Sequence, residues 1–542
     1  MKPAVSALIL RSSGVINKNR RLAIGAGSTI IFLIVVTLYF YLSILDSNQG
    51  NFVYGLDDPY IHLSIAKNYV EHGVWGLNPE TSTSSSSSPL WTMLLALIYS
   101  VTGILDLVPL VLNILFTLGV IFQLFSILLK FFDRPITVII WVNIIIYGAY
   151  LPRMVFMGME HVLHVFLLLI IINKLIGKFQ NNENLVFSFW IAIALSVATR
   201  YESIIFVAIL SVFFLVVDDK KYFFYCIFSA SLAFLFTSLL SICANGWIIP
   251  NSVFLRRTVF QFSFALPLTL LNNFYLTLQS KYQFTLILTA LFALVSLLKS
   301  QSDSIQKTFI LLFVLSAGTS ILHSMIGMMV LRYFFYLNVL LIIALIYGFY
   351  LVKRKGYVDF IVSKNFVGGI KLVVFGIFGV GLVWNGMMAN RKTVQASVNI
   401  FEQQVQTADF LRKYYNFSTV VLNDIGAISR YSDAKIVDIA GLADNQIAKL
   451  ISDSELNSNN LTKRMRGANV EIIILPEVVL NSLNLNELNW IHVGSWKIIN
   501  NVVCASETIH FLAPDKANAE KLAEHLREFN PLLPKTVITK LD

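Results

Sequence analysis

Residues 23–45 read AIGAGSTIIFLIVVTLYFYLSIL, an apolar stretch without a charged side chain. About 20 residues of this kind cross the hydrocarbon core of a bilayer as a helix. The stretch is too long for the apolar part of a secretory signal, and no small-residue cleavage site precedes Asp46, so we expect a retained span. Basic residues before it predict an N-terminus in the cytoplasm, with the chain outside from residue 46 onward: Lys2, Arg11, Lys18, Arg20 and Arg21.

The composition of the whole chain is that of a membrane protein. Of its 542 residues, 56% are hydrophobic and 13% are charged, whereas about a quarter of an ordinary soluble domain is charged. This excludes a soluble enzyme and a disordered chain. The net charge of +10 comes mainly from Lys and Arg in the loops that we assign to the inside, so we expect a lipid bilayer and no nucleic acid as a partner.

The distribution of apolar segments defines the predicted fold class. Together with the first span, they predict an α-helical polytopic membrane protein of about eleven transmembrane helices, N-terminus in and C-terminus out. The short apolar segment 90–104 is expected to lie against the outer face, because a crossing there would invert every later loop. The serine-rich run TSTSSSSSP at 81–89 predicts a flexible linker. The further spans are expected at 107–129, 136–151, 161–177, 184–199, 203–217, 222–244, 283–298, 308–323, 333–352 and 366–388.

The sequence becomes polar and mixed from about residue 390. Residues 1–389 are therefore predicted to form the transmembrane domain, with a first outer loop at 46–106, and residues 390–542 an extracytoplasmic α/β domain. ASVNIFEQQVQTADFLRKYY has helical spacing. Short strands are predicted in STVVLND, AKIVDIA, NVEIIILPE and the stretch 491–512.

Ionisable residues of the membrane half gather at the predicted outer ends of spans, whereas the middle of the spans is largely without them. This favours chemistry at the outer face over transport through the core. Asp58 followed by Pro59 is typical of a helix N-cap. Asp57 is not needed as a cap and is expected to be free to act as a general base or metal ligand. His62 shares a helix face with Asp58, and both a structural role and a role in the site stay open for it.

Several motifs resemble the GT-C superfamily of polytopic glycosyltransferases, in particular its arabinofuranosyltransferase-like and mannosyltransferase-like branches. The segment DDPYIHLSIAKNYVEHGVWGLNPETSTSSSSSPLWTMLL at 57–95 resembles their first outer loop. MGMEH, ATRYES, IIPNSVF and RYFF follow in the order of the family's motifs, and residues 420–444 resemble the start of its outer domain. Tyr201 and His161 depart from the family pattern. In the DIG of 424–426, we expect Gly426 to supply a turn.

The resemblance implies transfer of a sugar from a polyprenyl-phosphate donor to a cell-envelope glycan, lipid or protein, with inversion, at the outer face of a bacterial inner membrane. It implies Asp57 as the catalytic base, with Asp58 second. Arg332 is the first candidate for binding the donor phosphate, with Arg256 and Arg257 as alternates, although arginines at this depth also snorkel. Glu160 is expected to orient the acceptor or hold a metal. The need for a divalent metal stays open, with Asp57, Asp58 and Glu160 as candidate ligands.

Two other classes of function remain. A transporter or lipid flippase would depend on residues inside the spans rather than on Asp57. A non-catalytic envelope assembly factor would bind a partner through the outer domain and tolerate Asp57→Asn. The sequence does not define the sugar, the acceptor or the oligomeric state.

Overall fold

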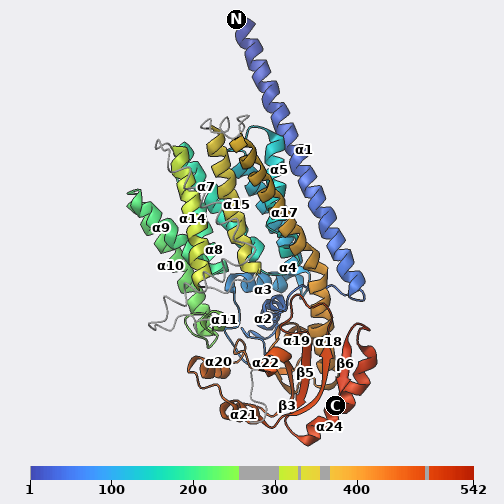
Figure 1. Cartoon of the computed structure of the whole chain (residues 1–542). Helices are drawn as coiled ribbons and strands as arrows, with labels where there is room; N and C mark the ends of the chain where they lie inside the picture. Colours follow the sequence, from blue (N-terminus) through green and yellow to red (C-terminus); the bar gives the residue numbers. More distant parts are fainter. Residues whose placement is uncertain (1, 256–303, 327–330, 355–365, 482–487) are drawn as a thin grey trace.

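The computed structural model describes residues 2–255, 304–326, 331–354, 366–481 and 488–542. A bundle of helices stands on a smaller domain that contains a sheet, and the start of α1 projects from the opposite end of the bundle (Figure 1). The helices of the bundle and its loops are α1 (Lys2–Ser47), α2 (Asp58–His72), α3 (Pro89–Thr102), α4 (Val108–Leu128), α5 (Pro135–Gly148), α6 (Leu151–Val155), α7 (His161–Asn181), α8 (Phe187–Thr199), α9 (Ser203–Val216), α10 (Lys220–Cys243), α11 (Asn251–Phe254), α14 (Ser304–Ile326), α15 (Leu331–Arg354) and α17 (Phe366–Ile400).

Six of the described helices are long and apolar enough to cross a membrane: α4, α7, α10, most of α14 and α15, and the part of α1 that starts at Gly25. Shorter apolar helices stand beside them, including α5, α8 and α9. The expected span at 283–298 lies outside the described residues, so the predicted count of about eleven is not confirmed. The polytopic helical class itself is confirmed.

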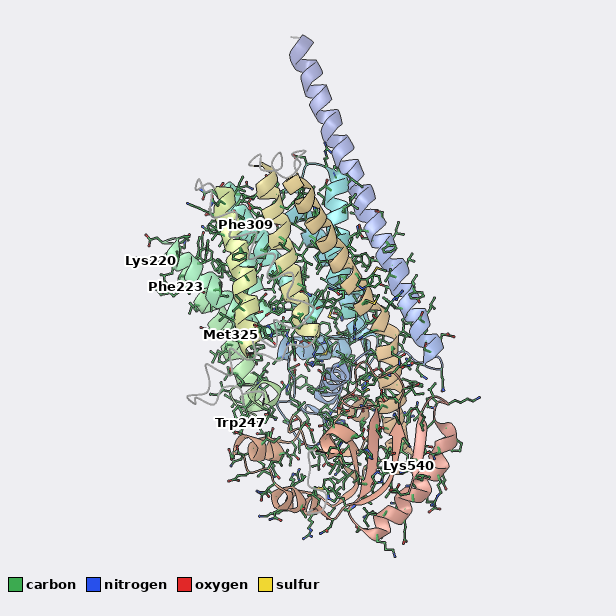
Figure 2. All side chains as sticks on the ribbon, in the orientation of Figure 1. Lys220, Phe223, Trp247, Phe309, Met325 and Lys540 are labelled. Carbon is green, nitrogen blue, oxygen red and sulfur yellow. The ribbon has the colours of Figure 1, made fainter. Side chains whose placement is uncertain are left out.

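The described parts of the loops that the sequence assigns to the outside lie at one end of the bundle, between the helices and the sheet domain (Figure 1). Lys220, at the start of α10, lies at the far end, whereas Trp247, just after α10, lies near the sheet domain (Figure 2). Along α14, Phe309 likewise lies toward the far end and Met325 lies nearer the sheet domain (Figure 2). The two loop helices α2 and α3 lie together at this near end (Figure 1). Segment 90–104, within which most of α3 falls, therefore sits where an outer-face helix was predicted.

The C-terminal domain is an α/β structure around one six-stranded sheet in the order β2-β1-β3-β5-β4-β6. β1 is parallel to β2 and β3, and the other neighbours are antiparallel. Strands are present in every segment where the sequence predicted them, with β4 and most of β5 in the stretch 491–512, and β6 was not predicted. The elements are η2 (Phe401–Val405), α18 (Gln406–Tyr414), β1 (Thr419–Leu422), α19 (Gly426–Tyr431), β2 (Lys435–Asp438), α20 (Asn445–Ser452), α21 (Ser458–Gly467), β3 (Val470–Pro476), α22 (Glu477–Leu480), β4 (Ile491–Lys497), β5 (Thr508–Ala513), α24 (Lys516–Phe529), η3 (Asn530–Leu532) and β6 (Ile538–Leu541).

A continuous helix and the helix α19 both connect this domain with the bundle. α17 runs without a break through residue 390 and passes into η2 and α18, so a helix rather than a loop connects the two parts. Within the sheet domain, Phe410 of α18 packs against Trp496 of β4, Phe511 of β5 and Phe529 of α24. α18 therefore forms part of the domain's apolar core, and the parallel strand β1 leads from that core to α19, which contacts α2.

Candidate active site

Asp58 and Arg332 form an ion pair at the end of the bundle that faces the sheet domain. Nη1 of Arg332, at the start of α15, lies 2.5 Å from Oδ2 of Asp58, the first residue of α2. A cavity of about 40 Å³ opens beside the pair. Residues far apart in the sequence line it: Asp58, Ile61, His62, Ser85, Ser87, Met159, Arg200, Ser252, Arg332, Tyr333 and Leu442. The structure thus brings together a carboxylate and a guanidinium that sequence reasoning paired only through a family resemblance.

The neighbouring carboxylate of Asp57 has a different partner. Its Oδ2 accepts a hydrogen bond from the amide of Gly426 at 2.6 Å, and its Oδ1 accepts one from the amide of Ala427 at 2.7 Å. Asp57 therefore caps the first turn of α19 in the sheet domain. The expectation that Asp57 has no capping role is wrong, and so is the expectation that Asp58 is the N-cap of α2, because the helix begins at Asp58 and Asp57 occupies the cap position.

The position of Gly426 also differs from the prediction. It opens α19, and a positive φ is not found there. What requires glycine is a close approach, because an added Cβ would lie 2.1 Å from the carbonyl oxygen of Asp57. Burial at this contact raises the pKa of Asp57 to about 7, and the nearby carboxylate of Asp424 acts in the same direction, against the lowering effect of the two amides.

A second charged group is buried beside the cavity. Arg200, in the loop between α8 and α9, donates from Nη1 to Oε1 of Glu160 at 2.5 Å and from Nη2 to Oε1 of Glu202 at 2.5 Å. The ring of Tyr333 lies between two guanidiniums, 4.8 Å from that of Arg200 and 5.3 Å from that of Arg332. Arg200 was not among the predicted site residues, although its place at the outer end of a span was a usable signal.

His62 lies between the cavity and Glu160. Its Nδ1 is 2.7 Å from the hydroxyl of Thr92, and its Nε2 is 3.9 Å from Oε2 of Glu160. Burial lowers the pKa of His62, so the neutral ring is favoured at neutral pH. His62 is both a packed residue of α2 and a residue of the cavity wall, which unites the two alternatives left open by the sequence.

The serine-rich run is not a flexible linker. Four of its hydroxyl residues are at most 3% exposed, namely Ser84, Ser85, Ser86 and Ser88. Ser84 bonds to Ser241 at the end of α10, and Ser88 donates to the carbonyl of Thr199 at the end of α8. The prediction failed because low complexity describes composition alone, whereas small hydroxyl side chains also fit closely packed, hydrogen-bonded contacts between helices.

The candidate metal ligands do not fit a metal site. Asp57 is held by amides of α19, Asp58 by Arg332 and Glu160 by Arg200. Across the part of the chain that the structure describes, groups of three or more metal-ligating side chains are not found. The alternates Arg256 and Arg257 lie outside the described residues.

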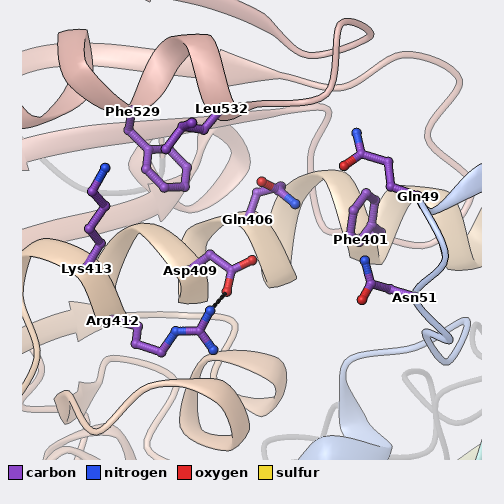
Figure 3. A pocket seen from close by; sticks show the side chains of 9 residues that line it. All are labelled: Gln49, Asn51, Phe401, Gln406, Asp409, Arg412, Lys413, Phe529 and Leu532. Atoms are coloured by element: carbon purple, nitrogen blue, oxygen red, sulfur yellow. Dashed lines mark hydrogen bonds and ion pairs between the residues drawn. The ribbon is translucent and has the colours of Figure 1, made fainter.

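A larger pocket lies at a different place, between α18 and the end of α24 (Figure 3). Its lining includes the ion pair of Asp409 and Arg412, with 2.6 Å between Oδ1 and Nη2, and the side chain of Lys413. It contains none of the acidic and basic residues at the outer ends of the spans. The pocket at Asp58 and Arg332 is therefore the candidate active site.

The fold and site were compared with known proteins. The model of a domain of unknown function (DUF8728) matches residues 398–515, most of the sheet domain. No curated protein sequence matches the chain. The crystal structure of ArnT from Cupriavidus metallidurans bound to undecaprenyl phosphate is similar to 91% of this chain and 99% of its own, with a TM-score of 0.50 and 10% identity.

Two other solved structures give lower scores. ArnT in the apo state has a TM-score of 0.48 at 9% identity, covering 91% of this chain and 99% of its own. The Archaeoglobus fulgidus oligosaccharyltransferase tethered with an acceptor peptide has a TM-score of 0.43 at 11% identity, covering 94% and 75%. The similarity to ArnT bound to undecaprenyl phosphate confirms the GT-C resemblance at the level of the fold. In particular, the chain shares the architecture of ArnT along almost its whole length.

Proposed function

We propose that the protein is a membrane glycosyltransferase that moves a sugar from a polyprenyl-phosphate donor to a cell-envelope glycan, lipid or protein. The observation that carries the proposal is the pairing of Asp58 with Arg332 in a cavity at the outer ends of the spans. The fold of a lipid-phosphate-binding relative supports it. The site then faces the periplasm or cell exterior of a bacterial inner membrane, together with the sheet domain.

Asp58 is the better candidate for the general base. It lines the cavity and is 38% exposed, whereas Asp57 does not line the cavity and has both oxygens on backbone amides. In the reaction, the acceptor oxygen attacks the anomeric carbon and the bond from that carbon to the phosphate oxygen breaks. The phosphate keeps the electron pair, and the acceptor proton passes to Asp58. One displacement of this kind inverts the anomeric centre.

Arg332 supplies the positive charge for the leaving phosphate. A guanidinium can hold two phosphate oxygens at once, and its charge stabilises the negative charge that develops on them. A phosphate that binds Arg332 competes with Asp58 for the same donors. Donor binding therefore releases the Asp58 carboxylate from its ion pair and makes it available for the acceptor hydroxyl.

Transfer by purified protein tests this function. Wild type is incubated with a panel of polyprenyl-phosphate sugars and envelope acceptors, beside Asp58→Asn, Asp57→Asn and Arg332→Ala. We expect glycosylated product from wild type and loss of about 10²-fold or more of the rate in Asp58→Asn. Consumption of no donor by wild type would reject the enzyme. Equal rates in wild type and Asp58→Asn would reject the base.

A further inference from the structure

The sheet domain contacts the start of α2 through a set of specific bonds. Beyond the two amide bonds to Asp57, Ser429 of α19 donates to the hydroxyl of Ser64 at 3.0 Å. At the end of the first outer loop, Asp106 pairs with Arg430 and accepts a hydrogen bond from the hydroxyl of Tyr431 at 2.9 Å. α19 therefore contacts the first outer loop at its beginning and its end.

A second contact between the two domains lies beside the cavity. The side-chain amide of Asn251, in α11, donates to Oδ1 of Asn445 at 2.8 Å and lies 3.3 Å from the carbonyls of Gly441 and Leu442. Leu442 itself and Ser252, the residue after Asn251, both line the cavity. The loop after β2 in the sheet domain thus supplies part of the cavity wall.

We propose that the sheet domain is a working part of the active site, and that Asp57 is the positioning residue through which it holds Asp58 opposite Arg332. Asp57 and Asp58 are consecutive residues, with Asp57 at the N-cap position of α2 and Asp58 as its first residue. A shift of the Asp57 backbone therefore moves the Asp58 carboxylate. The bonds from Gly426 and Ala427 hold the Asp57 carboxylate, and Gly426 also lies close against the Asp57 carbonyl group. Both residues belong to the segment matched by the domain of unknown function. The catalytic part of this inference rests on the proposed glycosyltransferase function.

Two glycine substitutions in the same domain form a matched pair. In Gly426→Ala the new Cβ would lie 2.1 Å from the Asp57 carbonyl oxygen, whereas in Gly467→Ala no atom lies within 4 Å. We expect kcat to fall about 10²-fold in Gly426→Ala, because a shift of about 1 Å at a reacting group has an effect of this size. Gly467→Ala should match wild type. Equal kcat in Gly426→Ala and wild type would overturn the proposal.

A cross-link tests the contact without an activity measurement. Ser64 and Ser429 are hydrogen-bonded through their hydroxyls, so Ser64→Cys with Ser429→Cys places two thiols at a distance suited to a disulfide. We expect oxidation to close it in otherwise wild-type protein and in Gly467→Ala, and to close it much less in Gly426→Ala. Failure of the pair to cross-link in the otherwise wild-type protein would overturn the contact, even if the protein transferred no sugar.

The pH profile separates positioning from catalysis. If Asp58 is the base, Asp57→Asn lowers kcat but keeps the fall of kcat/KM at acid pH that reports the titration of the base. Asp58→Asn removes that fall from the residual activity. The opposite pattern, with the acid limb lost only in Asp57→Asn, would make Asp57 the base and overturn the positioning role.

Discussion

Asp57 and Asp58 are consecutive residues whose carboxylates serve two different parts of the molecule. Asp57 accepts two amide hydrogen bonds from α19 of the sheet domain, and Asp58 pairs with Arg332 of the bundle. The first turn of α2 is therefore one of the places where the two domains meet. Because the carboxylates point to different partners, substitutions at the two positions should have different effects.

The proposed role of Asp58 as the general base predicts that different substitutions of Asp58 lower the transfer rate to different extents. Asp58→Asn removes the proton acceptor and should lower kcat about 10²- to 10⁴-fold. Asp58→Glu keeps a carboxylate on a longer side chain and should retain more activity than Asn. Steady-state transfer rates at saturating donor measure this. Equal loss in Asn and Glu variants would indicate a role in packing rather than in proton transfer.

Removal of the Arg332 guanidinium should weaken donor use. Arg332→Ala removes the cation that stabilises the leaving phosphate, and loss of one such group costs about 10²-fold or more in rate. Arg332→Lys should recover only part of the lost kcat/KM, since an ammonium group cannot bind two phosphate oxygens side by side as a guanidinium does. Arg412→Ala is the matched control, because Arg412 is an ion-paired arginine in the other pocket. Its kcat/KM should equal that of wild type.

Glu160 should matter for stability. It is fully buried and accepts from Arg200, so Glu160→Gln breaks a buried ion pair, a change that costs about 3–5 kcal/mol. The exposed pair of Glu80 and Lys435 provides the comparison, where Glu80→Gln should cost about 0–1 kcal/mol. Thermal unfolding in detergent measures both. Similar midpoints for the two variants would contradict the buried role of Glu160.

The serine-rich run should behave as folded structure. Ser88 is fully buried and donates to Thr199, so Ser88→Ala leaves a buried carbonyl without this donor and should cost about 1–3 kcal/mol. Ser82, which is half-buried and lies in the same run, is the control. Limited proteolysis should leave 81–89 intact in wild type. Rapid cleavage there would support a linker instead.

The free energy of unfolding should rise as the pH falls through the range in which Asp57 titrates. The folded pKa of about 7 lies above the ordinary value of 3.8, so the stabilisation from protonated Asp57 is fully present below about 4 and lost as pH rises through 7. Asp438 has a pKa raised by burial in the same way and adds to the trend. Thermal midpoints should therefore decrease from pH 5 to pH 8, less steeply in Asp57→Asn. Parallel slopes in wild type and Asp57→Asn would show that Asp57 does not titrate in this range.

The sequence by itself determined the class of the fold and predicted a region for the site. Apolar segments of membrane length, basic inner loops and strand-like segments after residue 390 depend on local composition and periodicity, which can be read without tertiary contacts. The same reasoning placed Asp58 and Arg332 at the outer ends of spans. These features follow from how each segment interacts with lipid or water.

Only the tertiary structure decided which carboxylate faces which partner. Asp57 and Asp58 have the same chemistry and adjacent places, and their separation depends on Gly426, some 370 residues further along the chain. The burial of the serine-rich run and the place of Leu442 in the cavity wall likewise arise from the packing of distant segments. Local pattern cannot encode such contacts, because each depends on the approach of two surfaces that the chain brings together only when it folds.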